Sequence, residues 1–386
     1  MNVLLVFTYG KTLEGWHNKG IIFREIALYK KLVEKKVKCS FLTFGDEQDF
    51  KYSDILGEIK VVPTYEFIKS RFFILKIIKS LFLPFKLKSL FKDADIIKTV
   101  QVYGSWILCI AKIFYNRKIV IRAGYQYLNA FKVRSSKKGI KNLVRYIVGY
   151  FFIFIFEFIA YKLADGIILT SDYDIPYIVK QYKLKKKFNN NKIRLFYNFI
   201  DIELFRPISV EKKDKYVLFI GNLHRGKNVV NLVNAFKDLE GFNLDIIGNG
   251  PDEEMLKKIV KENNINVNFL GLFPNNELPE ILNHYQIFLL PSIAEGNPKV
   301  LLEAMSCGIA CVGSNIRGIN NIINHKQNGV LCETDSQSIR NTILELYNNE
   351  ALRFKIGKNA RKFILENCSL NLITEKEYSF YQELLK

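Results

Sequence analysis

The chain has 386 residues and a formal net charge of +19, from 57 Lys and Arg against 38 Asp and Glu. This length exceeds what one compact core supports and fits two domains, while a hydrophobic content of 49% excludes a disordered or low-complexity protein. The basic balance suits an anionic partner such as nucleic acid, a phosphate-bearing substrate or a membrane. A coding bias towards Lys explains it equally well, so the charge alone selects no function.

Six cysteines form no CxxC pair and no zinc-ligand spacing with the four histidines. We therefore expect reduced thiols in or near the core of a cytoplasmic protein, at Cys39, Cys109, Cys307, Cys311, Cys332 and Cys368. The N-terminal residues MNVLLVFTYG have the pattern of a strand and lack the basic segment, apolar segment and cleavage site of a secretion signal.

The first half of the chain alternates short apolar runs with longer amphipathic segments. A helix is expected over Ile21–Val33, where apolar residues recur at helical spacing. Strands are expected over Val3–Thr8, Lys38–Phe44, Asp95–Val100, Lys118–Arg122 and Gly166–Thr170. This alternation predicts a parallel sheet with helices on both faces.

Two further segments of the first half are strongly basic or strongly apolar. Phe67–Lys92 holds seven Lys or Arg and no acidic residue, with aromatic and aliphatic residues between the charges. It fits a basic helix on an anionic membrane, and equally a helix packed on the N-terminal domain with its lysines in water. Tyr146–Phe156 is uncharged but shorter than the ~20 apolar residues of a membrane span, so we expect a buried or interfacial helix there.

The pattern restarts after a Pro-containing, charged segment, Phe196–Lys215. A helix is expected over Asn228–Leu239, and strands over Tyr216–Gly221, Leu244–Gly248, Val267–Leu270, Ile287–Leu290 and Ile309–Gly313. We expect an α/β protein with domains at 1–206 and 207–368 and a final helix within 369–386. Parallel α/β domains of this kind bind ligands at the carboxyl ends of their strands.

The strongest motif is PSIAEGNPKVLLEAMSCGIACVGS, from Pro291 to Ser314. A strand ends at Pro291, a Gly-containing loop carries Glu295, and the helix that follows carries Glu303. Amides of a loop that feeds a helix N-terminus favour anions, and a nearby carboxylate can accept hydrogen bonds from sugar hydroxyls. A single pair of Glu residues would by itself be more consistent with ordinary surface positions.

The whole run resembles the retaining glycosyltransferases of family 4 (glycosyl transferases group 1), whose hallmark is two Glu separated by seven residues. The resemblance implies a GT-B fold, with two Rossmann-like domains facing a central cleft and a C-terminal helix that crosses back to the N-terminal domain. It implies that Glu295 contacts the transferred sugar and Glu303 the ribose. The backbone facing the sugar and the diphosphate would be that of Asn297, Pro298, Lys299 and Val300.

A second match is GNLHRGKN, Gly221–Asn228, between a strand and a helix. The family has Gly and usually Arg here, with Lys six residues after the Gly; in this chain Asn222 replaces the Arg and Lys227 keeps the Lys. A fixed cation beside the departing diphosphate lowers the barrier to sugar transfer. Lys227 is the expected catalytic cation, with Arg225 supplying further charge.

Three weaker matches follow the same order as in the family. The connector keeps Asn198, Asp201, Phe205 and Pro207, and LDIIGNGP contributes Gly248 and Gly250 to a tight turn near the nucleotide. In the segment Arg317–Gly329 the final Asn-Gly matches, while Arg317 and Asn321 replace the family's Gly and Glu.

The N-terminal half resembles the family more loosely. Gly20 matches the second Gly of a loop near the donor, and Lys19 replaces the first. The cleft segment IRAGYQY lacks the family's His, which leaves Arg122, Tyr125 and Gln126 as acceptor-side candidates.

The resemblance implies a retaining transferase that uses no metal and no cofactor other than its nucleotide-sugar donor. The formal D-x-D matches at Asp93 and Asp172 are interpreted as structural. The acceptor would be a glycan or a lipid-linked saccharide of cell-surface polysaccharide or glycolipid synthesis, at the inner face of the membrane. A catalytically inactive homologue that acts as a membrane-associated scaffold is the alternative. Nucleic acid is not expected as a partner, because no recognition motif is present.

Overall fold

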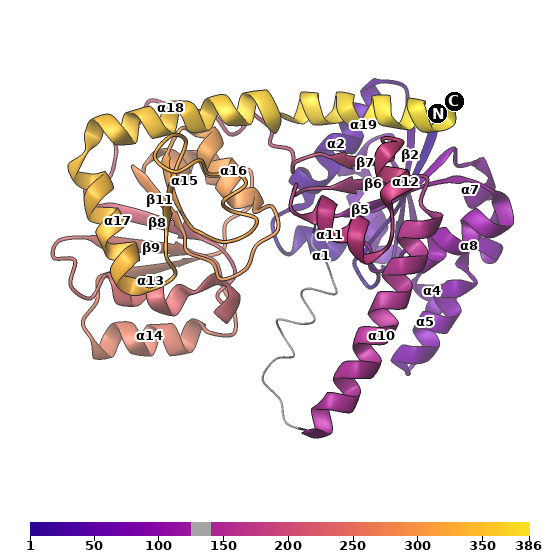
Figure 1. Cartoon of the computed structure of the whole chain (residues 1–386), viewed down its shortest axis with the longest axis horizontal. Coiled ribbons are helices and arrows are strands. Elements are labelled where there is room, and N and C mark those ends of the chain that lie inside the picture. Colours follow the sequence, from indigo (N-terminus) through magenta and orange to yellow (C-terminus); the bar gives the residue numbers. More distant parts are fainter. Residues whose placement is uncertain (125–139) are drawn as a thin grey trace. The chain divides into compact units, whose positions relative to one another are not determined.

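The computed structural model describes residues 1–124 and 140–386, without the side chains of 140–146 and 148. The chain forms two compact units (Figure 1). Unit 1 comprises Met1–Phe196 and Thr374–Lys386, and unit 2 comprises Tyr197–Ile373. The units thus divide after residues 196 and 373, where the sequence analysis places boundaries after 206 and 368.

Unit 1 is built on a parallel seven-stranded sheet in the order β3-β2-β1-β4-β5-β6-β7. Its strands are β1 (Asn2–Val6), β2 (Lys38–Thr43), β3 (Lys60–Pro63), β4 (Ile96–Thr99), β5 (Lys118–Ala123), β6 (Gly166–Leu169) and β7 (Ile193–Leu195). Most side chains of β1, β4, β5 and β6 are buried, as continuous apolar runs in a parallel sheet require. This architecture confirms the predicted fold class for the first half of the chain.

The helices of unit 1 are connections between parallel strands or additions at the sheet edges. They are α1 (Leu13–His17), α2 (Ile22–Glu34), α3 (Ser53–Leu56), α4 (Tyr65–Ile68), α5 (Phe73–Leu81), α6 (Leu83–Lys86), α7 (Lys88–Asp93), α8 (Trp106–Tyr115), α10 (Ile140–Leu163), α11 (Asp174–Gln181), α12 (Lys185–Asn189) and the 3-10 helix η1 (Glu47–Tyr52). The last helix, α19 (Leu370–Leu385), belongs to this unit from Thr374 onwards. The C-terminal helix therefore packs on the N-terminal unit, as predicted.

A buried ion pair holds α19 to the sheet of unit 1. Lys98 lies on β4, and its Nζ is 2.5 Å from Oε2 of Glu377 on α19, with side-chain exposures of 2% and 3%. The Tyr381 hydroxyl donates to the same oxygen at 2.5 Å. Burial lowers the pKa of Lys98, and the charge of Glu377 opposes that shift. The pair satisfies two charges that would otherwise be expensive to bury.

Unit 2 is built on a parallel six-stranded sheet in the order β10-β9-β8-β11-β12-β13. Its strands are β8 (Tyr216–Ile220), β9 (Asn243–Ile247), β10 (Val267–Gly271), β11 (Ile287–Leu290), β12 (Ala310–Ser314) and β13 (Val330–Cys332). Its helices are α13 (Val229–Ala235), α14 (Glu253–Glu262), α15 (Leu278–Asn283), α16 (Lys299–Ser306), α17 (Ser336–Asn348), α18 (Glu350–Asn367) and the 3-10 helix η2 (Arg225–Lys227). Both predicted Rossmann-like sheets are thus present.

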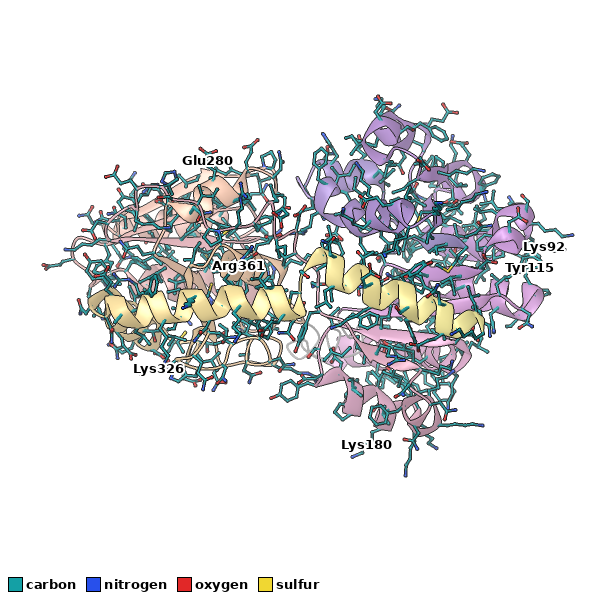
Figure 2. All side chains as sticks on the ribbon, turned by 90° about the horizontal axis from the view of Figure 1, so that it is seen from above. Lys92, Tyr115, Lys180, Glu280, Lys326 and Arg361 are labelled. Atoms are coloured by element: carbon teal, nitrogen blue, oxygen red, sulfur yellow. The ribbon has the colours of Figure 1, made fainter. Side chains whose placement is uncertain are left out.

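Arg361 on α18 ties the connector that opens unit 2 to α16 (Figure 2). Its guanidinium donates to the carbonyl oxygens of Ile202, Phe205 and Ser306 at 3.0, 2.7 and 3.0 Å. The Ser306 hydroxyl also donates to the Phe205 carbonyl at 2.6 Å. The connector predicted from the family motif is therefore part of the scaffold beneath α16.

The predicted placement of the cysteines in or near the core is confirmed, because all six are free and buried. The apolar run Tyr146–Phe156 lies on α10, but several of its aromatic side chains are exposed. Within the described ranges, no helix has the length and apolar character that crossing a membrane demands.

We expect Glu377→Ala to lower the free energy of unfolding by about 3–5 kcal/mol, because it leaves the Lys98 ammonium buried without its counter-charge. Urea denaturation measures the change. The matched control is Glu383→Ala, which breaks the exposed Arg194–Glu383 pair (2.6 Å, side chains 31% and 52% exposed) and is expected to cost less than about 1 kcal/mol.

The double variant Lys98→Met/Glu377→Leu replaces the charges with apolar groups and is expected to be more stable than Glu377→Ala alone. Equal stabilities of Glu377→Ala and Glu383→Ala would contradict the importance of the buried pair.

Candidate functional site

The candidate site lies at the carboxyl ends of β8 and β11, which are neighbours in the sheet of unit 2. The loop after β8 begins at Gly221 and contains η2, and the loop after β11 runs from Pro291 to the start of α16 at Lys299. Because both strands point the same way, their loops meet at one edge of the sheet. The two strongest sequence motifs are therefore brought together.

An ion pair joins these two loops. Lys227 Nζ lies 2.5 Å from Glu295 Oε1, and the Ser292 hydroxyl donates to the same carboxylate oxygen at 2.7 Å. The side chains of Lys227 and Glu295 are 17% and 12% exposed, so both are largely shielded but still reach the surface. The Ile293 amide also donates to the Gly226 carbonyl at 2.9 Å, which couples the loop backbones.

The local fold of the first loop explains the position of Lys227. His224 begins η2, and its Nδ1 accepts a hydrogen bond from the Gly226 amide at 3.0 Å. Asn228 ends the turn in the left-handed conformation (φ 58°), and its side-chain amide donates to the Thr334 carbonyl at 2.6 Å. Asn tolerates this backbone region better than most residues, so Asn228 allows the chain to turn directly into α13.

Two other residues of the loop after β8, Asn222 and Arg225, are also predicted to belong to the site. Both are exposed, whereas the Lys227 side chain is largely shielded. Arg225 is thus open to solvent two residues before the half-buried Lys227, and its charge is available at the surface of the same loop.

Glycines let the loops pack backbone to backbone. A Cβ at Gly248 (φ 140°) would lie 1.9 Å from the Gly221 carbonyl oxygen, and one at Gly250 would lie 2.3 Å from that of Leu223. These are separations that no side chain tolerates, so the predicted Gly248–Gly250 turn is required by contact with the loop after β8.

Gly318 packs against the loop that carries Glu295, and the sequence analysis did not single it out. It has φ 91°, and a Cβ there would lie 2.3 Å from the Glu295 carbonyl oxygen and 2.5 Å from that of Gly296. The sequence analysis noted that Arg317 replaces the first Gly of the family's Gly-Gly pair. Gly318 keeps the second Gly, and this match could have identified the position. Gly318 supports the backbone that carries Glu295.

Glu303 lies on α16 and is 1% exposed. Its Oε1 accepts a hydrogen bond from the Asn275 side-chain amide at 3.0 Å. Asn275 is itself buried and was missed by the sequence analysis, because nothing in its local sequence connects it to a residue on another element. This contact restricts the orientation of the Glu303 carboxylate.

Asn297 is held by the connector. Its Oδ1 accepts from the Asn198 backbone amide at 2.8 Å, and its carbonyl accepts from the Asn198 side chain at 2.6 Å. Asn297 thus fixes the end of the loop.

The remaining residues of this predicted run form the start of α16. Pro298 is the N-cap residue, Lys299 Nζ lies 5.2 Å from the centre of the Phe199 ring, and Val300 is half-buried. A helix N-terminus carries positive partial charge, and that of α16 follows directly after the loop that carries Glu295.

The candidates from the N-terminal half all belong to unit 1. Gly20 lies between α1 and α2 in the left-handed region (φ 65°). Arg122 is half-buried near the end of β5, where its backbone amide donates to the Thr99 hydroxyl at 3.0 Å. Tyr125 and Gln126 lie outside the described residues.

Residues 201–363 match the model of the family "Glycosyl transferases group 1". The chain is 29% identical over 210 residues to the N-acetyl-alpha-D-glucosaminyl L-malate synthase of Bacillus anthracis, covering 51% of this chain and 55% of that protein. It is 26% identical over 387 residues to the N,N'-diacetylbacillosaminyl-diphospho-undecaprenol alpha-1,3-N-acetylgalactosaminyltransferase of Campylobacter jejuni, covering 93% and 94%.

The extent of these matches varies, and the chain spans only 55%, 60% and 58% of the length of three of the relatives. Among solved structures, HepE of Anabaena in complex with UDP matches with a TM-score of 0.75 at 15% identity, covering 99% of this chain and 100% of that one. This likeness shows the same fold.

We expect Gly318→Ala to destabilise unit 2 by at least about 2 kcal/mol, because the new methyl group meets the Glu295 and Gly296 carbonyls and the backbone is left-handed. Gly271→Ala is the matched control: its φ is 75°, but no atom lies within 4 Å of the added Cβ. It should show only the backbone cost of about 1 kcal/mol. Chemical denaturation of both variants tests the difference, and equal losses would contradict the close approach at Gly318.

Proposed function

We propose that this chain, which matches the glycosyl transferases group 1 family over residues 201–363, transfers a sugar from a nucleotide-diphosphate donor to a glycan or lipid-linked acceptor. The observation that carries the proposal is the meeting of Lys227 and Glu295 at the carboxyl ends of β8 and β11. A cation and a carboxylate held side by side at this edge of a parallel sheet suit a ligand with both phosphates and hydroxyl groups.

Lys227 stabilises the departing diphosphate. As the bond between the sugar and the phosphate breaks, negative charge grows on the phosphate oxygens, and a fixed ammonium group lowers the energy of that state. When the donor binds, the Lys227 ammonium exchanges the Glu295 carboxylate for phosphate oxygens. The exposed Arg225 adds positive charge on the same loop, and the N-terminus of α16 adds its partial charge.

Glu295 orients the sugar, and Glu303 binds the ribose hydroxyls. Glu295 keeps the Ser292 hydroxyl as a partner when Lys227 turns to phosphate, so its carboxylate stays positioned to accept from sugar hydroxyls. The Asn275 side-chain amide donates to one carboxylate oxygen of Glu303. The orientation of the Glu303 carboxylate is therefore fixed before a ligand binds. Such prior ordering reduces the entropy lost when a ligand binds.

The reaction proceeds with retention of configuration through a transition state like an oxocarbenium ion. The acceptor hydroxyl attacks from the face that the nucleotide leaves. Lys227, Arg225 and the helix terminus supply the positive charge that a divalent metal provides in other transferases, so the transfer is metal-independent.

The relatives point to the class of acceptor and nucleotide. The Campylobacter relative is named for a diphospho-undecaprenol acceptor, and HepE was solved with UDP. We infer that UDP is the nucleotide to test first and that the acceptor is a saccharide on a polyprenyl diphosphate or a growing glycan, in the synthesis of cell-surface polysaccharide or glycolipid on the cytoplasmic side of the membrane.

A thermal-shift screen tests the donor. UDP or a UDP-sugar at 100 times its Kd should stabilise the chain by about 2.7 kcal/mol, because it binds only the folded state. GDP and its sugars provide the comparison. Glu303→Gln should weaken nucleotide binding on the order of 10-fold, since it removes the charge that the ribose hydroxyls donate to.

We expect Lys227→Ala to lower turnover about 100- to 1000-fold, as removal of a preorganised group that stabilises transition-state charge does elsewhere. Release of nucleotide from the donor found in the screen measures it. Lys237→Ala, an exposed lysine of the same unit, is the control and should leave turnover unchanged. Near wild-type turnover of Lys227→Ala would contradict the role of Lys227. Tight binding of nucleotide-sugars without transfer to any acceptor would favour the scaffold alternative.

A further inference from the structure

Unit 1 exposes many apolar side chains on or beside four of its helices. Each of the following is at least 39% exposed: Phe72, Phe73, Ile74, Leu75, Ile78, Phe82 and Phe85 around α5 and α6, Ile113 and Phe114 on α8, and Ile147, Phe151, Phe152, Phe156 and Ile159 on α10. We call this set the apolar platform. Single exposed apolar residues are normal, but a contiguous set marks an interaction surface.

The helices α5, α6, α8 and α10 are packed together around α8, so the platform is one surface of the fold. Trp106 at the start of α8 joins α5 and α10: its indole N–H donates to the Ser80 hydroxyl of α5 at 2.9 Å, and its ring lies 5.6 Å from that of Phe156 on α10. Phe85 and Phe114 pack edge to face at 4.7 Å. In Figure 1, α5 and α10 extend from the same end of this unit.

α10 buries its one acidic residue and exposes several apolar ones. Glu157 is 1% exposed and accepts a hydrogen bond from the Tyr182 hydroxyl, whereas Phe152, Phe156 and Ile159 are exposed at helical spacing. A helix whose charged residue faces the core and whose aromatic residues face outwards is not stabilised by water on its outer side. Its outer face needs an apolar environment.

Basic side chains accompany the platform. The segment Phe67–Lys92 carries seven Lys or Arg and no acid. Lys86 Nζ lies 5.8 Å from the Phe67 ring, and Lys92 Nζ lies 5.9 Å from the Tyr115 ring of α8 (Figure 2). Both ammonium groups thus lie near aromatic rings of unit 1, in the range of a cation–π contact.

We infer that the apolar platform docks on an anionic lipid surface. Aromatic and aliphatic side chains would enter the boundary between headgroups and acyl chains, while the lysines pair with anionic headgroups. A second copy of this chain fits less well, because apposed platforms would bring the acid-free basic segments of two molecules with a net charge of +19 together. In this docking mode the exposed faces of the helices lie along the surface of the bilayer.

The docking surface is a property of unit 1 and goes beyond the proposed transfer reaction, whose charged groups are in unit 2. Vesicle binding without any nucleotide-sugar therefore tests docking separately from catalysis. If the acceptor is lipid-linked, the docked state restricts the search for it to the plane of the membrane.

Sedimentation of the full chain with vesicles of phosphatidylcholine, with and without phosphatidylglycerol, tests the inference. The wild type should bind the anionic vesicles and lose binding as salt increases, because surface charges are screened. The variant Ile74→Ser/Phe151→Ser/Phe152→Ser should bind at least about 10-fold more weakly, since binding scales with the apolar area inserted. Its matched control is Met255→Ser/Leu272→Ser/Phe354→Ser, which removes exposed apolar residues of unit 2 and should bind as the wild type does.

Charge is tested separately with Lys86→Gln/Lys88→Gln/Lys92→Gln. Since each basic residue contributes about 5-fold at an anionic surface, the triple change should weaken binding on the order of 100-fold. Lys261→Gln/Lys355→Gln/Lys358→Gln removes the same charge from exposed positions of unit 2 and should have a much smaller effect.

Three outcomes would overturn the inference. The first is no binding of the wild type to anionic vesicles at low salt. The second is equal binding by the platform variant and its control. The third is self-association in analytical ultracentrifugation that the platform variant abolishes while vesicle binding is absent, which would identify the surface as an interface between copies.

Discussion

The candidate site depends on one contact between two loops. The Lys227–Glu295 ion pair, reinforced by the Ile293–Gly226 backbone bond, joins the carboxyl ends of β8 and β11. The surrounding glycines support both loops, because Gly248 and Gly250 approach the backbone of the loop after β8, and Gly318 that of the loop after β11, more closely than any Cβ permits. The chemistry of the site thus rests on a tightly packed backbone and not on side chains alone.

In unit 2, the side chains proposed to contact the ligand differ from the side chains that hold the loops in place. Lys227 and Glu295 still reach solvent, whereas Asn198, Asn275 and Asn297 are buried and use their amides to fix the elements around them. Hydrogen bonds from buried amides restrict the orientation of the groups that they bond. This arrangement explains how a short loop between a strand and a helix can present a carboxylate in a defined position.

Unit 1 buries charged side chains and exposes aromatic ones. Lys98, Glu377 and Glu157 are buried, whereas aromatic side chains on α5, α8 and α10 are exposed. The Lys98–Glu377 pair holds α19 to β4, and the hydrogen bond from the Tyr182 hydroxyl to Glu157 fixes one side of α10 to the core. Phe152 and Phe156 of α10 remain exposed.

The sequence by itself determined the strands at the sheet centres, because a parallel strand covered on both faces must be a continuous apolar run, and it located the motifs around Lys227 and Glu295. It missed β3, β7 and β13, which lie at sheet edges and contain partly exposed residues that interrupt the apolar run. Only the tertiary structure decided that Gly318 supports Glu295, that Asn275 holds Glu303, and that α10 turns Glu157 inwards. Those facts depend on contacts between residues far apart in the chain, which local pattern cannot encode.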